Sequence, residues 1–260
     1  MTSDDSAAEL PDHKSPATAP PSIPDNDAIS LLKTARQQLV DQLGRVIVGQ
    51  EAVIDELLIS LFSRGHCLLE GVPGLAKTLM INTLSEALNL SFSRIQFTPD
   101  LLPADLTGTE IYRPQDASFV FRQGPLFHNL VLADEVNRAP AKVQSALLEA
   151  MGERQITVGS VTYPLPELFM VMATQNPIEQ EGTYPLPEAQ LDRFLLQVNI
   201  DYPHLAAERE ILTKTTGAHE EQPAKVMDAD DLMNAQRTVR HIPAGESVMG
   251  AILELVHAGR

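Results

Sequence analysis

A short stretch of the chain carries the residue types that bind nucleotide phosphates. Residues 69–78 read LEGVPGLAKT, in which four residues separate Gly71 from Ala76, Lys77 and Thr78. Glycines let backbone N–H groups curl around a phosphate, a lysine reaches the β- and γ-phosphates, and a threonine hydroxyl holds Mg²⁺. The N-terminus of the following helix adds its own positive field. The predicted binding loop for a nucleoside triphosphate comprises Gly71, Val72, Pro73, Gly74, Leu75, Ala76, Lys77 and Thr78.

Ala76 stands where the usual pattern of such a loop has glycine. Because alanine carries a Cβ, we expect a backbone conformation at this position that an L-residue accepts. Taken alone, the stretch could also be an ordinary Gly/Pro connection between a strand and a helix. The prediction of nucleotide binding therefore depends on the motifs that follow.

Two carboxylates, Asp134 and Glu135, follow directly after an apolar run of strand length. A buried parallel strand delivers the residues at its carboxyl end to the ligand crevice. There Asp134 would hold Mg²⁺ through its water shell, and Glu135 would accept a proton from the attacking water. An isolated pair of this kind could equally cap a helix, but a phosphate loop earlier in the same sheet favours the chemical interpretation.

Two further polar residues extend this set. Asn176 follows another apolar strand and could orient the lytic water or touch the γ-phosphate, although Asn-Pro is also a common turn. Arg193 could form an exposed ion pair of little energy with Asp192. Alternatively, Arg193 could stabilise the charge on a transferring phosphoryl group.

The elements that must position these residues alternate between strand and helix. Helical patterns are expected at 78–90, 139–151 and 188–192, and they lie between most of the apolar runs. This alternation predicts an α/β fold with a parallel five-stranded sheet flanked by helices. The expected strands are Cys67–Leu69, Phe92–Phe97, Leu130–Ala133, Leu168–Ala173 and Phe194–Ile200.

Helices are also expected on both sides of this alternating region. The segment Ala28–Leu43 has an amphipathic pattern, and a second helix follows Gln50. From His204 onwards only helical pieces are expected. The inward-facing residues of the two first helices are predicted to be Leu31, Leu32, Ala35, Leu39 and Leu43, and then Val53, Ile54, Leu57, Leu58, Leu61 and Phe62.

Composition limits the classes of partner. The 260 residues include 19 basic and 35 acidic ones, a net charge of −16, which disfavours binding to nucleic acid or to an anionic membrane. No run approaches the roughly 18 apolar residues of a membrane helix. Residues 1–28 are acidic and proline-rich, so we expect a disordered tail and no signal peptide. With Cys67 as its single cysteine, the chain is expected to be cytoplasmic.

The order of these motifs resembles the AAA+ ATPases and, within them, the MoxR family. The resemblance covers about residues 30–260, and the sequence match is close across the core. Ala at position 76 is common in that family. The stretches that carry the resemblance are 69–78 (LEGVPGLAKT), 133–140 (ADEVNRAP), 151–158 (MGERQITV), 173–177 (ATQNP) and 191–194 (LDRF).

The resemblance implies roles for particular residues. Lys77 and Thr78 match the Walker A loop, Asp134 and Glu135 match Walker B, and Asn176 matches sensor 1. Arg193 matches the arginine finger, which acts on the ATP of a neighbouring subunit, and Arg138 and Arg154 are further candidates for contacts across that interface. Val48, Gly49 and Gln50 match the segment that packs near adenine in this family. Insertions are implied between residues 97 and 125, and a hairpin between 153 and 166.

The resemblance also implies a function and a domain layout. It implies an ATP-hydrolysing ring, of six copies in the family pattern, that uses ATP and Mg²⁺. Such chaperone-like remodellers mature or assemble partner proteins, often ones with a von Willebrand factor A domain or a metal cofactor. The expected layout is a tail at 1–28, an ATPase core at 29–203 and a partial helical lid at 204–260 that looks truncated, because no sensor 2 arginine is found.

Two other functions stay open. The incomplete lid would also suit a nucleotide-dependent interaction module with little turnover. A DNA-handling motor of the same superfamily is a weaker alternative, since the charge of −16 opposes it.

Overall fold

The computed structural model describes residues 26–178, 182–215 and 222–259. The expected tail at 1–28 lies outside these ranges except for its last residues, which begin the first helix, α1 (Asn26–Val46). The described residues up to Arg240 form one compact unit, and those from 241 onwards belong to a second one, with helix α9 (Glu246–Ala258). None of the described helices has the length and apolar character needed to cross a membrane.

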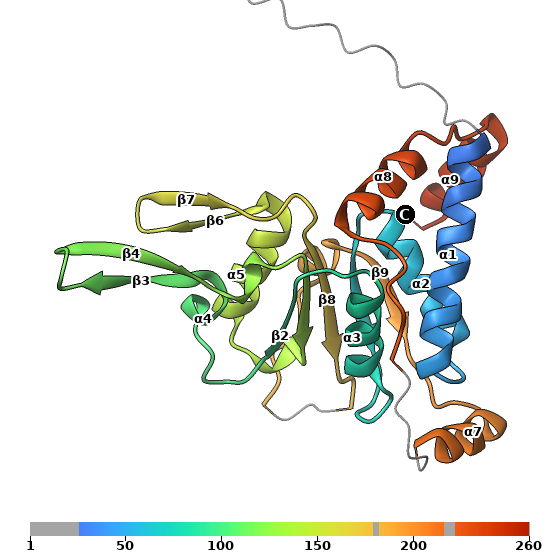
Figure 1. Ribbon diagram of the computed structural model, residues 1–260, viewed down its shortest axis with the longest axis horizontal. Helices are drawn as coiled ribbons and strands as arrows, with labels where there is room; N and C mark the ends of the chain where they lie inside the picture. The colour runs from blue at the N-terminus through green and yellow to red at the C-terminus, as the bar shows by residue number, and fades with distance from the viewer. Residues whose placement is uncertain (1–25, 179–181, 216–221, 260) are drawn as a thin grey trace, which may run out of the picture. The chain divides into compact units, whose positions relative to one another are not determined.

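The core of the larger unit is the predicted parallel five-stranded sheet, with strand order β2-β5-β8-β1-β9 (Figure 1). Every neighbouring pair in it runs parallel. All five expected strands are present, within about two residues of their predicted ends. Their bounds are β1 (His66–Glu70), β2 (Phe92–Gln96), β5 (Leu130–Asp134), β8 (Met170–Gln175) and β9 (Phe194–Asn199).

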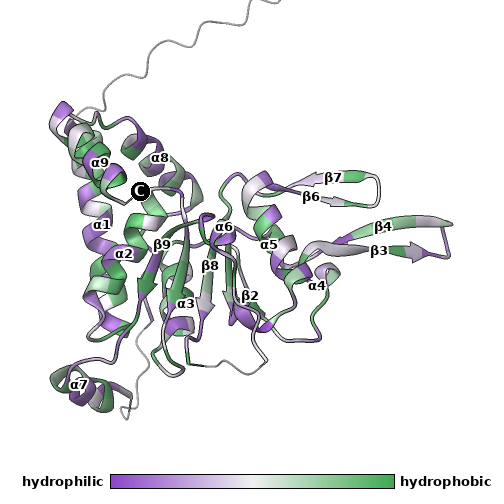
Figure 2. Ribbon diagram, turned by 180° about the vertical axis from the view of Figure 1, so that it is seen from behind, coloured by the Kyte–Doolittle hydropathy of each residue, from purple (hydrophilic) through white to green (hydrophobic). Residues whose placement is uncertain are grey.

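Helices cover both faces of this sheet because its central strands β1, β5 and β8 are buried on both sides. Alternate residues of β1 illustrate this: Cys67 and Leu69 pack into one hydrophobic cluster and Leu68 into the other. Figure 2 shows the apolar colour concentrated on these strands. The first cluster includes α1, α2 (Glu51–Phe62), α3 (Lys77–Ala87) and α8 (Ala229–Arg240), and the second includes α4 (Pro103–Thr107) and α5 (Ala141–Glu153).

The predicted inward face of α2 is confirmed, since its six apolar residues are all buried. In α1 one expectation was wrong. Leu31 is 71% exposed, whereas Leu39 and Leu43 are buried. Leu32 and Ala35 pack against the core beside them, so the buried stripe passes through Leu32 and leaves its neighbour in solvent.

Two hairpins leave the sheet on the side of α4 and α5, where insertions were expected (Figure 1). One is β3 (Gly108–Arg113) with β4 (Ser118–Gln123), and the other is β6 (Gln155–Val158) with β7 (Val161–Pro164). The rings of Phe121 and Tyr163 stack with centroids 4.1 Å apart, which joins the two hairpins.

The remaining described elements are short. Helix α6 (Glu188–Leu191) precedes β9, and α7 (Leu205–Thr215) follows it. Two 3₁₀ turns, η1 (Pro125–Phe127) and η2 (Val136–Arg138), flank β5. As expected, no strand follows His204 among the described residues. The predicted domain boundary at 203/204 stays a prediction, because α7 and α8 belong to the same compact unit as the sheet.

Candidate functional site

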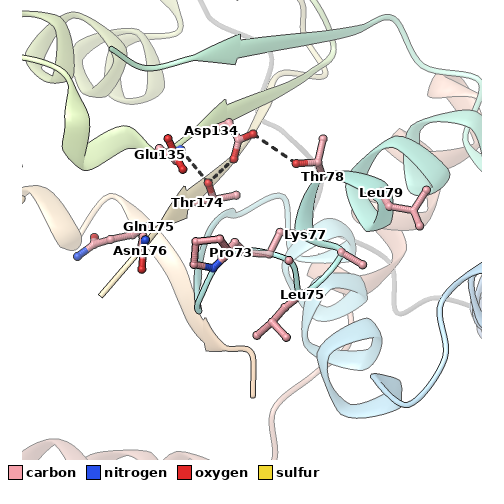
Figure 3. A pocket seen from close by; sticks show the side chains of 12 residues that line it. Pro73, Leu75, Lys77, Thr78, Leu79, Asp134, Glu135, Thr174, Gln175 and Asn176 are labelled. Carbon is pink, nitrogen blue, oxygen red and sulfur yellow. Dashed lines mark hydrogen bonds between the residues drawn. The ribbon is translucent and has the colours of Figure 1, made fainter. Parts of the chain in front are cut away.

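The carboxyl ends of β1, β5 and β8 meet at a cavity of about 390 Å³ (Figure 3). The sheet brings together segments that lie some sixty and forty residues apart in the chain, because parallel strands deliver their carboxyl ends to one edge. The loop after β1 provides one wall, and the ends of β5 and β8 provide the other. The lining residues are Pro73, Gly74, Leu75, Ala76, Lys77, Thr78, Leu79, Asp134, Glu135, Thr174, Gln175 and Asn176.

Backbone conformation shapes the phosphate loop. Gly74 has φ +89°, and a Cβ on Gly71 would lie 2.7 Å from the carbonyl oxygen of Ile200, so glycine is required at both. The expectation for Ala76 was wrong in an instructive way. Its φ of 55° and ψ of 21° are left-handed, a conformation that an alanine adopts only at a cost of roughly 1–2 kcal/mol.

Lys77 begins α3, and its side chain turns back over the loop. Its ammonium donates a hydrogen bond of 2.9 Å to the carbonyl oxygen of Val72 and another to the carbonyl oxygen of Gly71. Burial lowers the pKa of Lys77, while Asp134 and Glu135 act against that shift. The loop therefore holds a cation in place with carbonyl oxygens, which phosphate oxygens could replace.

Asp134 is the centre of a hydrogen-bond network at the end of β5. The Thr174 hydroxyl donates to Oδ1 at 2.6 Å, and the Arg94 guanidinium donates to Oδ2 at 2.6 and 3.1 Å. The Thr78 hydroxyl lies 3.3 Å from the same Oδ2. A hydroxyl and a carboxylate side by side are the hard oxygen ligands that Mg²⁺ prefers, so these residues fit the ion.

Glu135 has a left-handed backbone with φ 56° and ψ 50°. Its Oε2 accepts a hydrogen bond of 2.8 Å from the Gln96 amide, and Arg138 Nε lies 3.0 Å from the same oxygen. A non-glycine residue in such a conformation stores strain, which is typical of functional sites. In this arrangement the carboxylate is held by two donors, and a role as base requires that it be released from them.

Sequence reasoning missed three residues of this site: Arg94, Gln96 and Thr174. A signal was present for Thr174, which follows an apolar run in β8, whereas β2 (FSRIQ) is polar at three of its five positions, so Arg94 and Gln96 do not stand out in it. The β2–β5 register, which pairs Gln96 with Asp134, brings Arg94 and Gln96 to the two carboxylates, and the β5–β8 register places Thr174 beside them. Both registers follow from the strand order, which the sequence does not display.

Asn176 lies at the cavity as expected, 5% exposed, with its Oδ1 accepting from the backbone N–H of Ile178. The Val48–Gln50 segment is not among the residues that line the cavity. Gln50 instead donates to the carbonyl oxygen of Asp201, and Gly49 lies against Ala207. The predicted contact with adenine stays a prediction.

Arg193 and the phosphate loop lie at opposite ends of strand β1. It directly precedes β9, whose first residue Phe194 pairs with His66, the first residue of β1. The phosphate loop follows the last residue of β1. Arg193 therefore lies at the amino edge of the sheet with Arg64 and Arg154, and not beside the Lys77 of its own chain.

The chain is similar in sequence to a known protein family and to individual known proteins. A family model described as "ATPase family associated with various cellular activities (AAA)" matches residues 66–196. The chain is 47% identical over 224 residues to Chaperone MoxR1 of Mycobacterium tuberculosis, covering 86% of this chain and 59% of that one. It is 46% identical over 222 residues to the uncharacterized protein YeaC of Bacillus subtilis, covering 85% and 69%.

A solved structure is similar as well. The crystal structure of a proposed ATPase from Cytophaga hutchinsonii superimposes with a TM-score of 0.80 at 48% identity. The match covers 90% of this chain and 72% of the other. The chain thus spans a little over half the length of MoxR1 and about seven tenths of the other two.

Proposed function

Because the chain belongs to the MoxR family of AAA+ ATPases, we propose that it binds ATP and hydrolyses it to ADP and phosphate. The observation that carries this proposal is the convergence of Lys77, Asp134 and Glu135 on one cavity of about 390 Å³. Lys77 begins α3, Asp134 ends β5 and Glu135 follows it, and each residue has the chemistry that phosphoryl transfer needs.

Each residue of the site has its own role in the proposed reaction. Backbone N–H groups of residues 71–78 and the N-terminus of α3 attract phosphate oxygens, and Lys77 adds a full positive charge. Thr78 and Asp134 would hold Mg²⁺, which when bound neutralises charge on the β- and γ-phosphates. Glu135 accepts the proton of the attacking water once it leaves Gln96 and Arg138, and Asn176 orients that water.

Arg193 supports the proposal of a ring-shaped homo-oligomer. It lies at the amino edge of the sheet, so it would act on the phosphates of a neighbouring copy. A guanidinium placed against the transferring group is worth roughly 10³–10⁵ in rate. We propose a hexamer on the family resemblance.

The proposed biological role is chaperone-like remodelling of client proteins. It rests on the likeness to a relative named Chaperone MoxR1 and on the family pattern, in which clients often carry a von Willebrand factor A domain or a metal cofactor. The two hairpins, with Tyr112 and Phe119 exposed, are the proposed client contacts. We propose the cytoplasm as the compartment, since ATP is available there, and no nucleic-acid partner at a net charge of −16.

The test compares Glu135→Gln with Glu149→Gln, an exposed position on α5. Glu135→Gln should keep ATP binding and lower the hydrolysis rate at least 100-fold, because the amide cannot take a proton from water. Glu149→Gln should hydrolyse ATP at the wild-type rate. Normal turnover by Glu135→Gln would refute the role of Glu135. Wild-type protein that binds ATP without turnover at any protein concentration would favour a nucleotide-dependent interaction module.

A further inference from the structure

A second cavity, of about 560 Å³, opens at the amino edge of the same sheet. Segments from four places in the chain line it: the end of α2 with the residues before β1, the residue after α5, a residue shortly before β8, and the last turns of α8. The lining residues are Phe62, Ser63, Arg64, Arg154, Glu167, Met233, Gln236, Arg237, Val239 and Arg240. We call this cavity the arginine pocket.

Arginines outnumber carboxylates four to one in the arginine pocket, in a chain whose net charge is −16. Arg237 Nη2 lies 3.5 Å from Glu167 Oε1, with both side chains 62% exposed, which makes this a weak pair at the rim. Arg64 uses one guanidinium nitrogen to donate to the carbonyl oxygen of Glu167 at 2.8 Å. Glu167 is thus the single counter-charge among the lining residues.

Arg237 also donates from Nη1 to Asn234 Oδ1 at 3.3 Å, whereas several donors of the other arginines have no protein acceptor within the described ranges. Arg64 Nε is buried and makes no hydrogen bond there. The side chains of Arg154 and Arg240 also make none with described residues. Burial, together with Arg64 and Arg240, lowers the pKa of Arg154, which indicates that these cations repel one another. A buried unpaired donor costs free energy, so the pocket is built for an acceptor that the protein does not supply.

Neutralisation of helix dipoles does not account for the cluster. Three helices, α2, α5 and α8, end here, and each C-terminus carries roughly half a negative charge. With Glu167 these offset roughly two to three of the four positive charges. Moreover, the last carbonyls have other donors: Leu61 receives the N–H of Arg64 and the Gln236 amide, and Ala150 receives the N–H of Arg154. An excess of positive charge remains.

We propose that the arginine pocket binds the phosphate group of a small phosphomonoester, at a site separate from the nucleotide cavity. Guanidinium forks donate paired hydrogen bonds to phosphate oxygens, and a phosphate monoester carries about −1.5 to −2 charges, which matches the excess. A carboxylate has one charge and fewer acceptor sites. The volume of about 560 Å³ is typical of small-molecule sites, and Phe62, Met233 and Val239 provide an apolar wall for the organic part.

The experiment measures binding by calorimetry in the full chain, with Lys77→Ala in every sample to remove phosphate binding at the nucleotide loop. The probes are inorganic phosphate, phenyl phosphate, benzoate and a tripeptide containing O-phosphoserine. Arg154→Gln and Arg240→Gln test the pocket. Arg209→Gln, an exposed arginine on α7, is the matched control for loss of one charge.

Phenyl phosphate should bind more tightly than inorganic phosphate and much more tightly than benzoate. Arg154→Gln and Arg240→Gln should each weaken its binding about tenfold or more, because each removes a hydrogen bond to a charged group. Arg209→Gln should have no effect. Because Arg240 is exposed, its variant should fold even where a change at Arg154 disturbs the protein.

Four results would overturn the proposal. The first is an absence of phenyl phosphate binding in the Lys77→Ala background. The second is an equal loss of binding in Arg209→Gln and Arg240→Gln, which would indicate only general charge attraction. The third is benzoate that binds as tightly as phenyl phosphate. Preference for the phosphoserine peptide over phenyl phosphate would refute the assignment to a small molecule.

Discussion

The two edges of the central sheet carry two proposed anion sites that are built in opposite ways. At the carboxyl edge α3 begins, so its dipole and the N–H groups of the loop would attract phosphate beside a single cation, Lys77. At the amino edge, helices end and their dipoles repel anions. An anion site there requires several arginines, and Arg64, Arg154 and Arg240 supply them.

The edges also differ in how their charges are paired. At the carboxyl edge Asp134 is bonded to Arg94 and Glu135 to Arg138, so the site is compensated before any ligand arrives. At the amino edge cations remain in excess. At the carboxyl edge the backbone would supply much of the attraction for an anion, whereas at the amino edge side chains must supply it. Four predictions test this comparison, in order of decreasing effect.

The variant Arg193→Ala tests whether the amino edge of one copy acts on the nucleotide at the carboxyl edge of a neighbouring copy. We expect ATP binding to be unchanged and hydrolysis to fall by roughly 10³-fold or more, because the guanidinium that stabilises the transferring phosphoryl group is lost. ATPase rates measured against protein concentration, with the variant mixed into wild type, check this. Arg209→Ala is the control. A variant that hydrolyses ATP normally and does not inhibit the mixture would show that the amino edge takes no part.

His66, beside Arg154 at the amino edge, should make the protein sensitive to acid. Burial and then Arg154 lower its pKa from 6.5 to about 4, and its Nδ1 accepts the N–H of Val171. Because the pKa of His66 is lower in the folded protein, its neutral side chain contributes stability that is fully present above pH 6.5. This contribution is lost as the pH falls from 6.5 towards 4. The loss is about 3 kcal/mol, from 1.4 kcal/mol per pKa unit.

Urea unfolding of His66→Gln and wild type between pH 7 and 4 measures this effect. The variant should lack that part of the pH dependence, whereas His204→Gln, at an exposed position after the carboxyl end of β9, should keep it. Parallel stability curves for wild type and His66→Gln would contradict the prediction.

Thr174→Val should weaken the carboxyl edge. The Thr174 hydroxyl donates to Asp134 at 2.6 Å and accepts the N–H of Glu135 at 2.8 Å, and the residue is fully buried. Valine has nearly the same shape, so the change removes the Thr174 bonds to Asp134 Oδ1 and to the N–H of Glu135 without creating a cavity, while Asp134 Oδ2 keeps its bonds from Arg94. We expect a loss of about 2 kcal/mol in the free energy of unfolding. Thr162→Val, on an exposed hairpin, should cost much less, and equal losses would argue against this network.

Ala76→Gly should have the smallest effect. Glycine accepts the left-handed conformation of position 76 without strain, but it also gains freedom in the unfolded chain. The net change in unfolding free energy should be a gain of less than about 1 kcal/mol. Thermal unfolding measures it, with Ala87→Gly at the end of α3 as a control that should destabilise. A destabilised Ala76→Gly would show that the loop is not strained there.

Much of this protein could be predicted from local pattern. The strands and helices follow from hydrophobic periodicity, and the phosphate loop and the Asp134–Glu135 pair were placed correctly at the carboxyl edge. The errors were also local: Leu31 lies just off the buried stripe of α1, and Ala76 adopts a conformation that its side chain disfavours. Residue type alone does not report the φ angle that packing imposes.

The sequence by itself determined which chemistry is present, because a lysine, a hydroxyl and two carboxylates at fixed offsets from strand ends can be read without coordinates. The tertiary structure alone decided which distant side chains support that chemistry. Arg94 and Gln96 reach the carboxylates through the β2–β5 register, and the arginine pocket forms where α2, α5 and α8 end together. The physical reason is that strand order and helix packing bring together residues whose separation along the chain carries no information about their distance.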